Sequence, residues 1–244
     1  MLEGLYSAAA GMSAQQKQLD AISNDLANES TSGYKSERVA FSDLLYNKFD
    51  VAGTETTDGA GASAQLIGRS EAQGSLQQTG DPLDLAIEGE GFFQVKRPNG
   101  QVALTRDGSF GVDANGTIVN SQGNPLVPPI KLPRGVSPGE VRIAPDGTVT
   151  AGTRSLGKIK LVTVTSPQHL LSDGNNGLTP TAASGAPRAA GKARMHQGAL
   201  EASNVNMASE MALMASTQRN YQLTSTAIQT QNQMMSIANQ LRAP

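Results

Sequence analysis

Two seven-residue repeats of apolar residues, one near each end of the chain, constrain its fold more than any other feature. The N-terminal repeat consists of Leu5, Met12, Leu19 and Leu26, with Ala8 and Ile22 at neighbouring positions. The C-terminal repeat consists of Met207, Met214, Tyr221, Ile228 and Met235. An apolar period of seven is typical of helices that pack lengthwise against other helices. The repeats therefore predict a long helix at each end of the chain.

Each apolar repeat is too narrow to bury one side of a helix by itself. Beside the apolar repeat of the C-terminal helix, a second row of residues at the same seven-residue spacing is polar. This second line consists of Gln218, Ser225, Asn232 and Asn239. Pairing with one other helix would leave these polar groups half-buried and short of hydrogen-bond partners. We therefore expect both helices to complete their packing among copies of the same chain. The predicted assembly interface comprises Leu5, Met12, Leu19, Ile22, Leu26, Met207, Met211, Met214, Tyr221, Ile228 and Met235.

Local signals predict where the two helices begin and end. The first is expected over residues 3–28, because the following segment, up to Gly33, is rich in residues that end helices. The second is expected to begin at Asn206, a good N-cap residue, and to end near Leu241. Glu210 lies in its first turn, where the helix dipole favours negative charge.

The composition changes twice between the helices. Residues 47–80 are rich in Gly, Ala, Ser, Thr and Gln and poor in large apolar side chains, so we expect a loop or a long hairpin ordered by its neighbours. From residue 84, short apolar runs alternate with turn signals, which is typical of antiparallel β structure. The predicted class is α+β, with N- and C-terminal helices forming a coiled-coil layer and a central, mainly antiparallel β domain. The expected regions are an N-terminal helix (1–35), a Gly-rich connecting segment (36–80), the β domain (81–197) and a C-terminal helix (198–244).

The bulk composition excludes several classes of function. Only 16% of the 244 residues are charged, and the formal net charge of −2 gives no electrostatic basis for binding nucleic acid. The chain has no Cys and two His, too few for a zinc site. The N-terminus lacks the features of a secretory signal, and no apolar run is long enough for membrane insertion.

Candidate catalytic groups are few. Asp84, Glu88 and Glu90 are spaced so that a strand would place all three on one face, which is the single hint of an acid/base pair. A solvated outer face explains the same spacing more simply. We therefore expect no catalytic, cofactor or metal site, with a secreted hydrolase using these carboxylates as a remote alternative. A surface adhesin could share terminal helices, but it would normally carry a signal peptide and an anchor.

Three blocks of sequence resemble the rod and hook family of bacterial flagellar axial proteins. The N-terminal block contains Asn24, Asn28, Gly33, Tyr34 and Lys35. The middle block contains Gly89, Gly91, Phe92, Phe93, Arg106, Asp107 and Gly108. The C-terminal block contains Ser203, Asn204, Val205 and Asn206. These matches are long and ordered, and with the general layout they cover nearly the whole chain.

The resemblance implies a structural subunit that stacks helically into a hollow drive shaft crossing the periplasm, with the terminal helices inside and the β domain outside. It implies contacts with copies of itself, with proximal rod and hook subunits and with surrounding ring proteins. It also implies delivery by the flagellar type III export apparatus without cleavage.

Within the family, residues 41–46 and 78–80 are most similar to distal rod members, and a proximal rod member is the alternative. Rod and hook members differ in the region of residues 47–80. We therefore expect this segment to set the stiffness of the assembly, and deletion of about residues 50–66 to make it more flexible.

Overall fold

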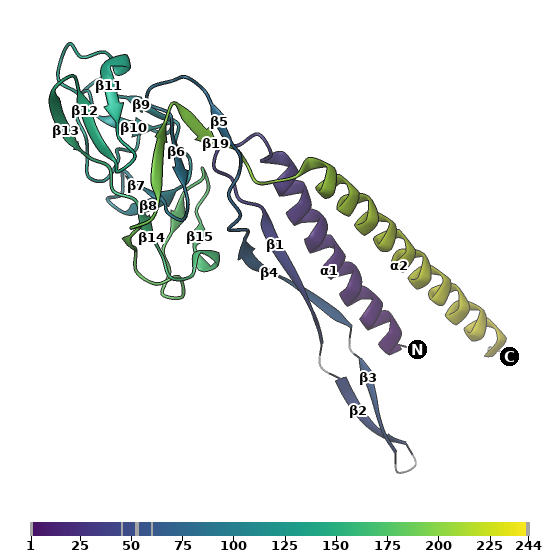
Figure 1. The fold of residues 1–244 in the computed structure, drawn as a ribbon. Helices are drawn as coiled ribbons and strands as arrows, with labels where there is room; N and C mark the ends of the chain where they lie inside the picture. Colours follow the sequence, from purple (N-terminus) through teal and green to yellow (C-terminus); the bar gives the residue numbers. More distant parts are fainter. Residues whose placement is uncertain (1, 45, 52–53, 60, 243–244) are drawn as a thin grey trace. The chain divides into compact units, whose positions relative to one another are not determined.

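The computed structural model describes residues 2–44, 46–51, 54–59 and 61–242 (Figure 1). The chain forms two compact units, each discontinuous in sequence. The helical unit contains Met1–Leu26, Glu37–Ile67 and Asn206–Pro244, and the β unit contains Ala27–Ser36 and Gly68–Val205. The fold is α+β, as the sequence predicts.

Two long helices dominate the helical unit, with ends close to those expected. Helix α1 spans Leu2–Ala27 and helix α2 spans Met207–Arg242. The backbone N–H of Ser209 donates to Oδ1 of Asn206 at 3.1 Å, which confirms Asn206 as the N-cap of α2. The helices run antiparallel and side by side (Figure 1). Gln231 accordingly packs over Gly4, 3.6 Å from the position that a Cβ would occupy.

The second line of α2 differs from the one expected. Half-buried or buried side chains follow Glu210, Thr217, Thr224 and Gln231. Of the expected residues, Ser225 is half-buried, Gln218 and Asn232 are exposed, and the side chain of Asn239 lies outside the described residues. Threonine is tolerated at these positions because its hydroxyl can bond to a carbonyl of the preceding helical turn. Thr217 donates to the carbonyl of Leu213 at 2.8 Å, and Thr224 donates to that of Asn220 at 3.0 Å. The threonine methyl groups then remain to pack beside the apolar repeat.

The base of a long ribbon of strands lies against α1. Its base pairs β1 (Glu37–Asp43) with β4 (Ala62–Arg69), and its far end pairs β2 (Tyr46–Val51) with β3 (Thr54–Gly59). The region expected to be a loop or a long hairpin is therefore built largely of strands.

Small residues on α1 allow this close approach. Gly61 lies against Ser7 and Ala10, so that an added Cβ would be 3.0 Å from the Cα of Ser7. Farther along, Lys17 donates to the carbonyl of Ala64 at 3.2 Å. Ala14 and Ala64 are 2% and 1% exposed. This small-residue face was not recognised from the sequence, because alanine also occurs on solvated helix faces.

The β unit consists of short strands joined by tight turns. The strands are β5 (Leu76–Gln78), β6 (Leu85–Glu88), β7 (Phe93–Lys96), β8 (Val102–Thr105), β9 (Phe110–Val112), β10 (Ile118–Asn120), β11 (Val141–Ile143), β12 (Thr148–Ala151), β13 (Arg154–Lys158), β14 (Val162–Thr163), β15 (Leu171–Ser172), β16 (Leu178–Thr179), β17 (Arg188–Ala189), β18 (Arg194–Gln197) and β19 (Ala199–Glu201). The pairs are β9–β10, β14–β17, β6–β18 and β5–β19, and the larger sheets are β11–β12–β13 and β15–β16–β8–β7. All these pairings are antiparallel, which confirms the expected class of sheet.

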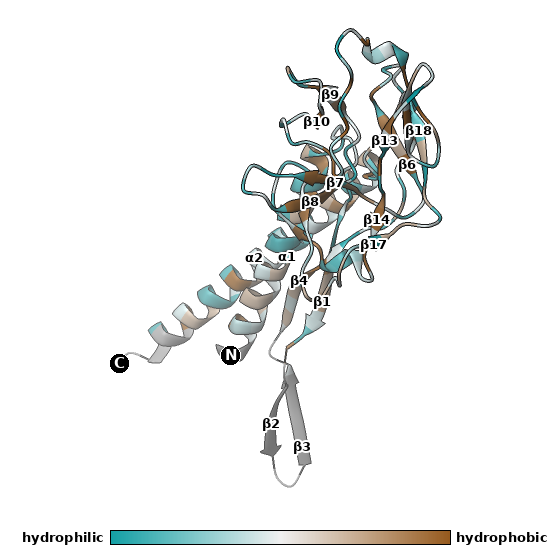
Figure 2. Cartoon of the chain, turned by 90° about the vertical axis from the view of Figure 1, so that its left-hand side faces the viewer, coloured by the Kyte–Doolittle hydropathy of each residue, from teal (hydrophilic) through white to brown (hydrophobic). Residues whose placement is uncertain are grey.

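The core of the β unit is built from aliphatic residues and phenylalanine. Phe93 is fully buried and packs edge-on against Phe110, with ring centroids 5.1 Å apart. The apolar strands β7 and β8 stand out in brown in Figure 2. Leu85, Ala86 and Ile87 are all buried, so β6 lacks the alternation of buried and exposed residues that a solvated outer face would require. Both faces of this strand are covered.

Candidate structural junction

A buried carboxylate lies at the centre of the most unusual polar cluster in the β unit. The side chain of Glu201, at the end of β19, has no exposed surface. Its Oε1 accepts a hydrogen bond from Nζ of Lys35 at 2.5 Å, and its Oε2 accepts one from Nη1 of Arg106 at 3.1 Å. One carboxylate therefore binds two cations from segments far apart in the sequence. We call this cluster the Glu201 junction.

Further bonds satisfy most of the buried groups of the junction, whereas the Nε of Arg106 is buried without a described hydrogen-bond partner. Lys35 also donates to the carbonyl of Ala72 at 2.7 Å, and Arg106 donates to that of Gly89 at 2.9 Å. The guanidinium of Arg106 lies over the Phe92 ring, 5.3 Å from its centroid. Oε1 of Glu201 accepts a second bond, at 3.0 Å, from a backbone N–H in the segment before β5. These partners offset much of the cost of burying charge.

Burial and ion pairing oppose each other at the two cations. Burial lowers the pKa of Lys35, while its hydrogen bond to Glu201 acts in the opposite direction. Burial likewise lowers the pKa of Arg106, and the charge of Glu201 opposes this shift. Removing the carboxylate would leave two desolvated cations without their shared counter-charge.

Two glycines allow the backbones to meet at this cluster. Gly33 has φ of +69°, and its N–H donates to the carbonyl of Glu201 at 2.7 Å. A Cβ at Gly33 would lie 2.5 Å from the carbonyl carbon of Arg106. A Cβ at Gly108 would overlap the carbonyl of Leu85. Both positions therefore require glycine because no space remains for a side chain.

The three motif blocks converge on the Glu201 junction. Lys35 comes from the N-terminal block, Arg106 from the middle block, and Asn204 from the C-terminal block beside Glu201. Oδ1 of Asn204 accepts the N–H of Ser36 at 2.8 Å, and its Nδ2 donates to the carbonyl of Ala72 at 2.9 Å. The segment that follows α1 is thus bonded directly to the segment that precedes α2.

Other motif residues shape the backbone around the junction. Asn28 accepts bonds from Thr31 through its carbonyl and its side chain, at 3.1 and 3.2 Å. Asp107 accepts the N–H of Ser109 at 3.0 Å, forming a tight turn. Ser203 accepts the N–H of Val205 at 3.3 Å. The remaining motif residues lie in the same segments or in helix α1: Asn24, Tyr34, Gly91, Phe93 and Asn206.

Sequence reasoning missed the residue at the centre of the junction. Glu201 follows Ala199 and Leu200 in a short strand, and both Ala199 and Glu201 are buried. The available signal was a carboxylate in the inward register of an apolar strand, which requires a cation partner. The sequence alone does not say which of the 19 lysines and arginines provides it.

The predicted interface residues differ in exposure within the single chain. Ile22 is 2% exposed, whereas Met207 and Met211 are 41% and 52% exposed. The others are partly buried: Leu5, Met12, Leu19, Leu26, Met214, Tyr221, Ile228 and Met235. The apolar repeats thus retain accessible surface beside their intrachain contacts. Their role in assembly remains a prediction.

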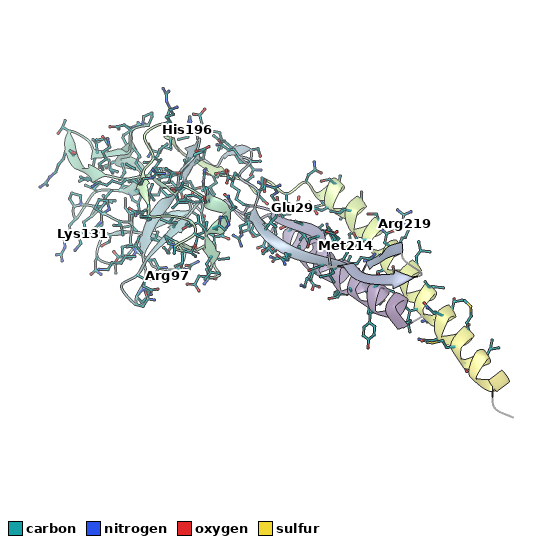
Figure 3. All side chains as sticks on the ribbon, turned by 90° about the horizontal axis from the view of Figure 1, so that it is seen from below. Glu29, Arg97, Lys131, His196, Met214 and Arg219 are labelled. Atoms are coloured by element: carbon teal, nitrogen blue, oxygen red, sulfur yellow. The ribbon has the colours of Figure 1, made fainter. Side chains whose placement is uncertain are left out.

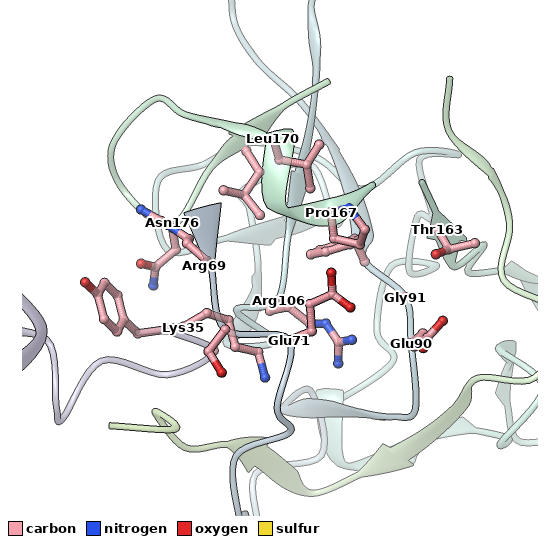
Figure 4. Close-up of a pocket in the computed structure, with 15 residues that line it drawn as sticks. Lys35, Arg69, Glu71, Glu90, Gly91, Arg106, Thr163, Pro167, Leu170 and Asn176 are labelled. Atoms are coloured by element: carbon pink, nitrogen blue, oxygen red, sulfur yellow. The ribbon is translucent and has the colours of Figure 1, made fainter. Parts of the chain in front are cut away.

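A small pocket beside the junction holds about 60 Å³ (Figure 4). Lys35, Arg69, Arg106, Glu71 and Glu90 contribute to its lining, together with Phe92 and Leu170. The cations and carboxylates balance, because Glu201 lies behind Lys35 and Arg106. The pocket therefore has no strong charge preference.

The three carboxylates suspected of catalysis have separate surroundings. Asp84 accepts a hydrogen bond from Thr79 at 2.5 Å, and Glu88 is bonded to Nε2 of His196 at 2.7 Å. Glu90 lines the pocket beside Arg106. Their contacts do not assemble an acid/base pair.

Among the described residues, no three His, Asp or Glu side chains are grouped so that they could hold a metal ion. Neither α1 nor α2 has an apolar stretch long enough to cross a membrane.

Three regions of the chain, which contain the three motif blocks, match models of known protein families. Residues 5–35 match the family model described as flagella basal body rod protein. Residues 86–151 match the D1 domain of the flagellar hook protein FlgE/F/G, and residues 196–241 match the C-terminal region of the flagellar basal body rod FlgEFG proteins.

Known relatives match over almost their entire length. The chain is 38% identical to the flagellar basal-body rod protein FlgG of Borreliella burgdorferi, covering 99% of both chains. It is 34% identical to FlgG of Caulobacter vibrioides, covering 99% of this chain and all of that one. It is also 30% identical to the rod protein FlgF of Mesorhizobium japonicum, covering 92% and 91%. The chain therefore belongs to the family of flagellar rod and hook proteins, as a structural subunit that resembles the FlgG members.

Proposed function

We propose that this protein polymerises into the flagellar rod as a drive shaft that transmits torque, without catalytic activity. The observation that carries the proposal is the Glu201 junction. Torque can pass between an outer and an inner layer only if the chain segments that connect them hold their positions. Within the β unit, Lys35, Arg106 and Glu201 hold the segment that follows α1 and the segment that precedes α2 to each other through buried, charge-assisted bonds.

The apolar repeats supply the second part of the proposal. Met214, Tyr221 and their neighbours keep accessible surface in the single chain, which supports their use between copies. Other axial proteins, including proximal rod and hook subunits, would contact the ends of the same assembly. Ring proteins would surround it, and the type III export apparatus would deliver each subunit.

The experiment replaces Met214 with Asp. A charge in a layer of packed helices would cost several kcal/mol, so we expect export to continue and rod assembly to fail. Gln222→Asp is the matched control, because Gln222 is exposed and lies outside the apolar repeat. Electron microscopy of purified basal bodies gives the readout. Normal rods in Met214→Asp would contradict the assembly role of the repeat.

The strand boundaries define a shorter deletion that tests whether the ribbon sets the stiffness of the assembly. Deleting residues 50–66 would remove Ala64, which packs in the helical unit. Deleting β2 and β3 alone would retain β1, β4 and their contacts with α1. We expect this shorter deletion to preserve polymerisation and to give curved or flexible rods. Rods as straight as wild type in electron micrographs would remove the assignment.

A further inference from the structure

Three Asn-Gly pairs give the β unit a chemical reactivity that the proposed function does not use. In an Asn-Gly pair the glycine has no Cβ, so the backbone nitrogen after the asparagine can reach the side-chain carboxamide and cause deamidation. All three pairs lie in tight turns, and in each turn the glycine N–H donates at 2.9 Å to the carbonyl that begins the turn. Differences in reactivity must therefore come from their surroundings. The pairs are Asn99-Gly100, Asn115-Gly116 and Asn176-Gly177.

The turn at Gly100 is the least anchored of the three. A Cβ at Gly100 would meet no described atom within 4 Å. A Cβ at Gly116 would lie 2.8 Å from the carbonyl oxygen of Leu132, which also donates its N–H to the carbonyl of Gly116 at 2.7 Å. A Cβ at Gly177 would lie 2.6 Å from Nη2 of Arg97. Opening the turn so that its nitrogen can react therefore disturbs the fewest contacts at Gly100.

The exposed side chain of Asn99 is held in a geometry that suits the reaction. Its Oδ1 accepts the backbone N–H of Gln101 at 3.0 Å, and its Nδ2 donates to Oε1 of Gln101 at 3.1 Å. The first bond folds the carboxamide over the Gly100 peptide, so that Cγ of Asn99 faces the nitrogen of Gly100. It also aims a donor at the oxygen on which negative charge develops during attack.

The other two asparagines have less suitable surroundings. The backbone N–H and Nδ2 of Asn115 donate to the carboxylate of Asp113 at 2.9 and 3.4 Å. The negative charge of Asp113 opposes the negative charge that attack would create on Asn115. Nδ2 of Asn176 donates to the carbonyl of Ser32 at 3.1 Å, which ties this side chain to a distant segment. Neither carboxamide oxygen accepts a backbone N–H among the described hydrogen bonds.

We propose that Asn99 is a site of spontaneous deamidation, with water as the co-reactant. The nitrogen of Gly100 loses its proton to water and attacks Cγ of Asn99. The new N–Cγ bond closes a succinimide ring, the Cγ–Nδ2 bond breaks, and ammonia leaves with a proton returned by water. A water molecule then opens the ring. Addition at Cγ gives aspartate, whereas addition at the backbone carbonyl carbon gives isoaspartate, whose main chain runs through Cγ.

The reaction changes a hairpin that carries part of the core. The turn joins β7 and β8, in which Phe93 and Leu104 have no exposed surface. Isoaspartate adds an extra carbon to the main chain of this turn. Either product also adds a negative charge near Arg97, which is paired with Asp173 and is labelled in Figure 3. An aged molecule therefore differs from a new one at the tip of this hairpin.

Mass spectrometry of the purified, folded protein tests the site. The three pairs lie in different tryptic peptides, so incubation in heavy-oxygen water at mildly alkaline pH reports on each position separately. We expect incorporation at Asn99 to be roughly ten-fold faster than at Asn115 or Asn176, which is less than a donor to an oxyanion contributes in a buried active site. In urea the three rates should converge. Equal rates in the folded protein, or a faster rate at Asn115 or Asn176, would overturn the proposal.

Two substitutions of Gln101 separate the effect of its N–H from the looseness of the turn. Gln101→Ala keeps the N–H and removes the Oε1 acceptor, so it should deamidate like wild type. Gln101→Pro removes the N–H that Asn99 accepts, and its rate should fall roughly ten-fold. A turn that proline merely loosened would react faster. An unchanged or faster rate in Gln101→Pro would overturn the role of this N–H, and no result here depends on polymerisation.

Discussion

Glu201 shows how one residue can connect three distant segments of a chain. A carboxylate with no exposed surface is costly to bury, and two cations together with a backbone N–H compensate for it. Its neighbours are equally constrained, because Gly33 has no room for a Cβ. In this structure the residues of the family motif serve packing and charge pairing.

Replacing Glu201 with Gln should destabilise the β unit strongly. The amide keeps the size of the side chain but leaves Lys35 and Arg106 as buried cations without a counter-charge, at a cost of about 3–5 kcal/mol. Urea unfolding followed by circular dichroism measures the change. Glu140→Gln is the control, because Glu140 is exposed, and it should change the free energy of unfolding by about 0.5 kcal/mol or less. Equal stability of the two variants would refute the structural role of Glu201.

Asp146 should titrate far below an ordinary aspartate. The N–H of Thr148 and the ammonium of Lys158 lower its pKa from 3.8 to about 2. Because the folded pKa lies below the unfolded one, the stabilisation is present above pH 3.8 and is lost as the pH falls towards 2. NMR titration of the side-chain carboxyl gives the pKa directly. Lys158→Met should raise it, and a midpoint near 3.8 in the wild-type protein would contradict the assignment.

At the scale of elements, helix α1 uses two faces for two purposes. Gly4 lies against Gln231 of α2, while Ser7 and Ala10 lie against Gly61 of the ribbon. Gln15 and Gln18 each have a buried side-chain oxygen for which no hydrogen-bond partner is described. Two unsatisfied amides in one helix fit an element whose surroundings are completed by other chains.

Enlarging Ala14 should separate the ribbon from the helix. Ala14→Leu adds volume at a position that is 2% exposed, and such overpacking typically costs about 1–3 kcal/mol. Ala9→Leu makes the same change at an exposed position of α1 and serves as the control. Amide hydrogen exchange of β1 and β4 in the monomer should accelerate in the first variant and stay unchanged in the second. Equal protection in both would show that this face is not an interface.

For the whole molecule, stability should be unevenly distributed. The β unit has a core of fully buried residues such as Phe93 and Leu104, whereas α2 exposes Leu213, Leu223, Met234 and Ile237. Helices gain most of their stability from packing, and α2 has little packing within one chain. Figure 3 labels Met214 and Arg219 in the first half of this sparsely covered helix.

Hydrogen exchange of monomer and polymer can test this distribution. In the monomer, amides of α2 should exchange much faster than those of β7 and β8, because local unfolding of the helix exposes little new apolar surface. Polymerisation should slow exchange in α2 and leave the β core unchanged. Protection of α2 equal to that of β7 in the monomer would contradict this picture.

The sequence by itself determined the α+β class, the ends of both helices and the antiparallel character of the β unit. These features depend on local signals: seven-residue apolar periods, the Asn206 N-cap and regularly spaced turns. The three motif blocks were also visible in the sequence. Their order and spacing identified the family before any contact was known.

Only the tertiary structure decided which residues meet. The Lys35–Glu201–Arg106 cluster joins positions separated by 166 and 95 residues, and no local pattern specifies such a pairing. The buried row of α2 follows Thr217 and Thr224, whereas the expected row contains the exposed Gln218 and Asn232. The heptad allows both neighbouring rows, and the choice depends on which segments pack beside the helix. The role of the small-residue face of α1 is evident only from its contact with the ribbon. Sequence periodicity fixes what an element can be, whereas burial and charge pairing depend on which distant segments the fold brings together.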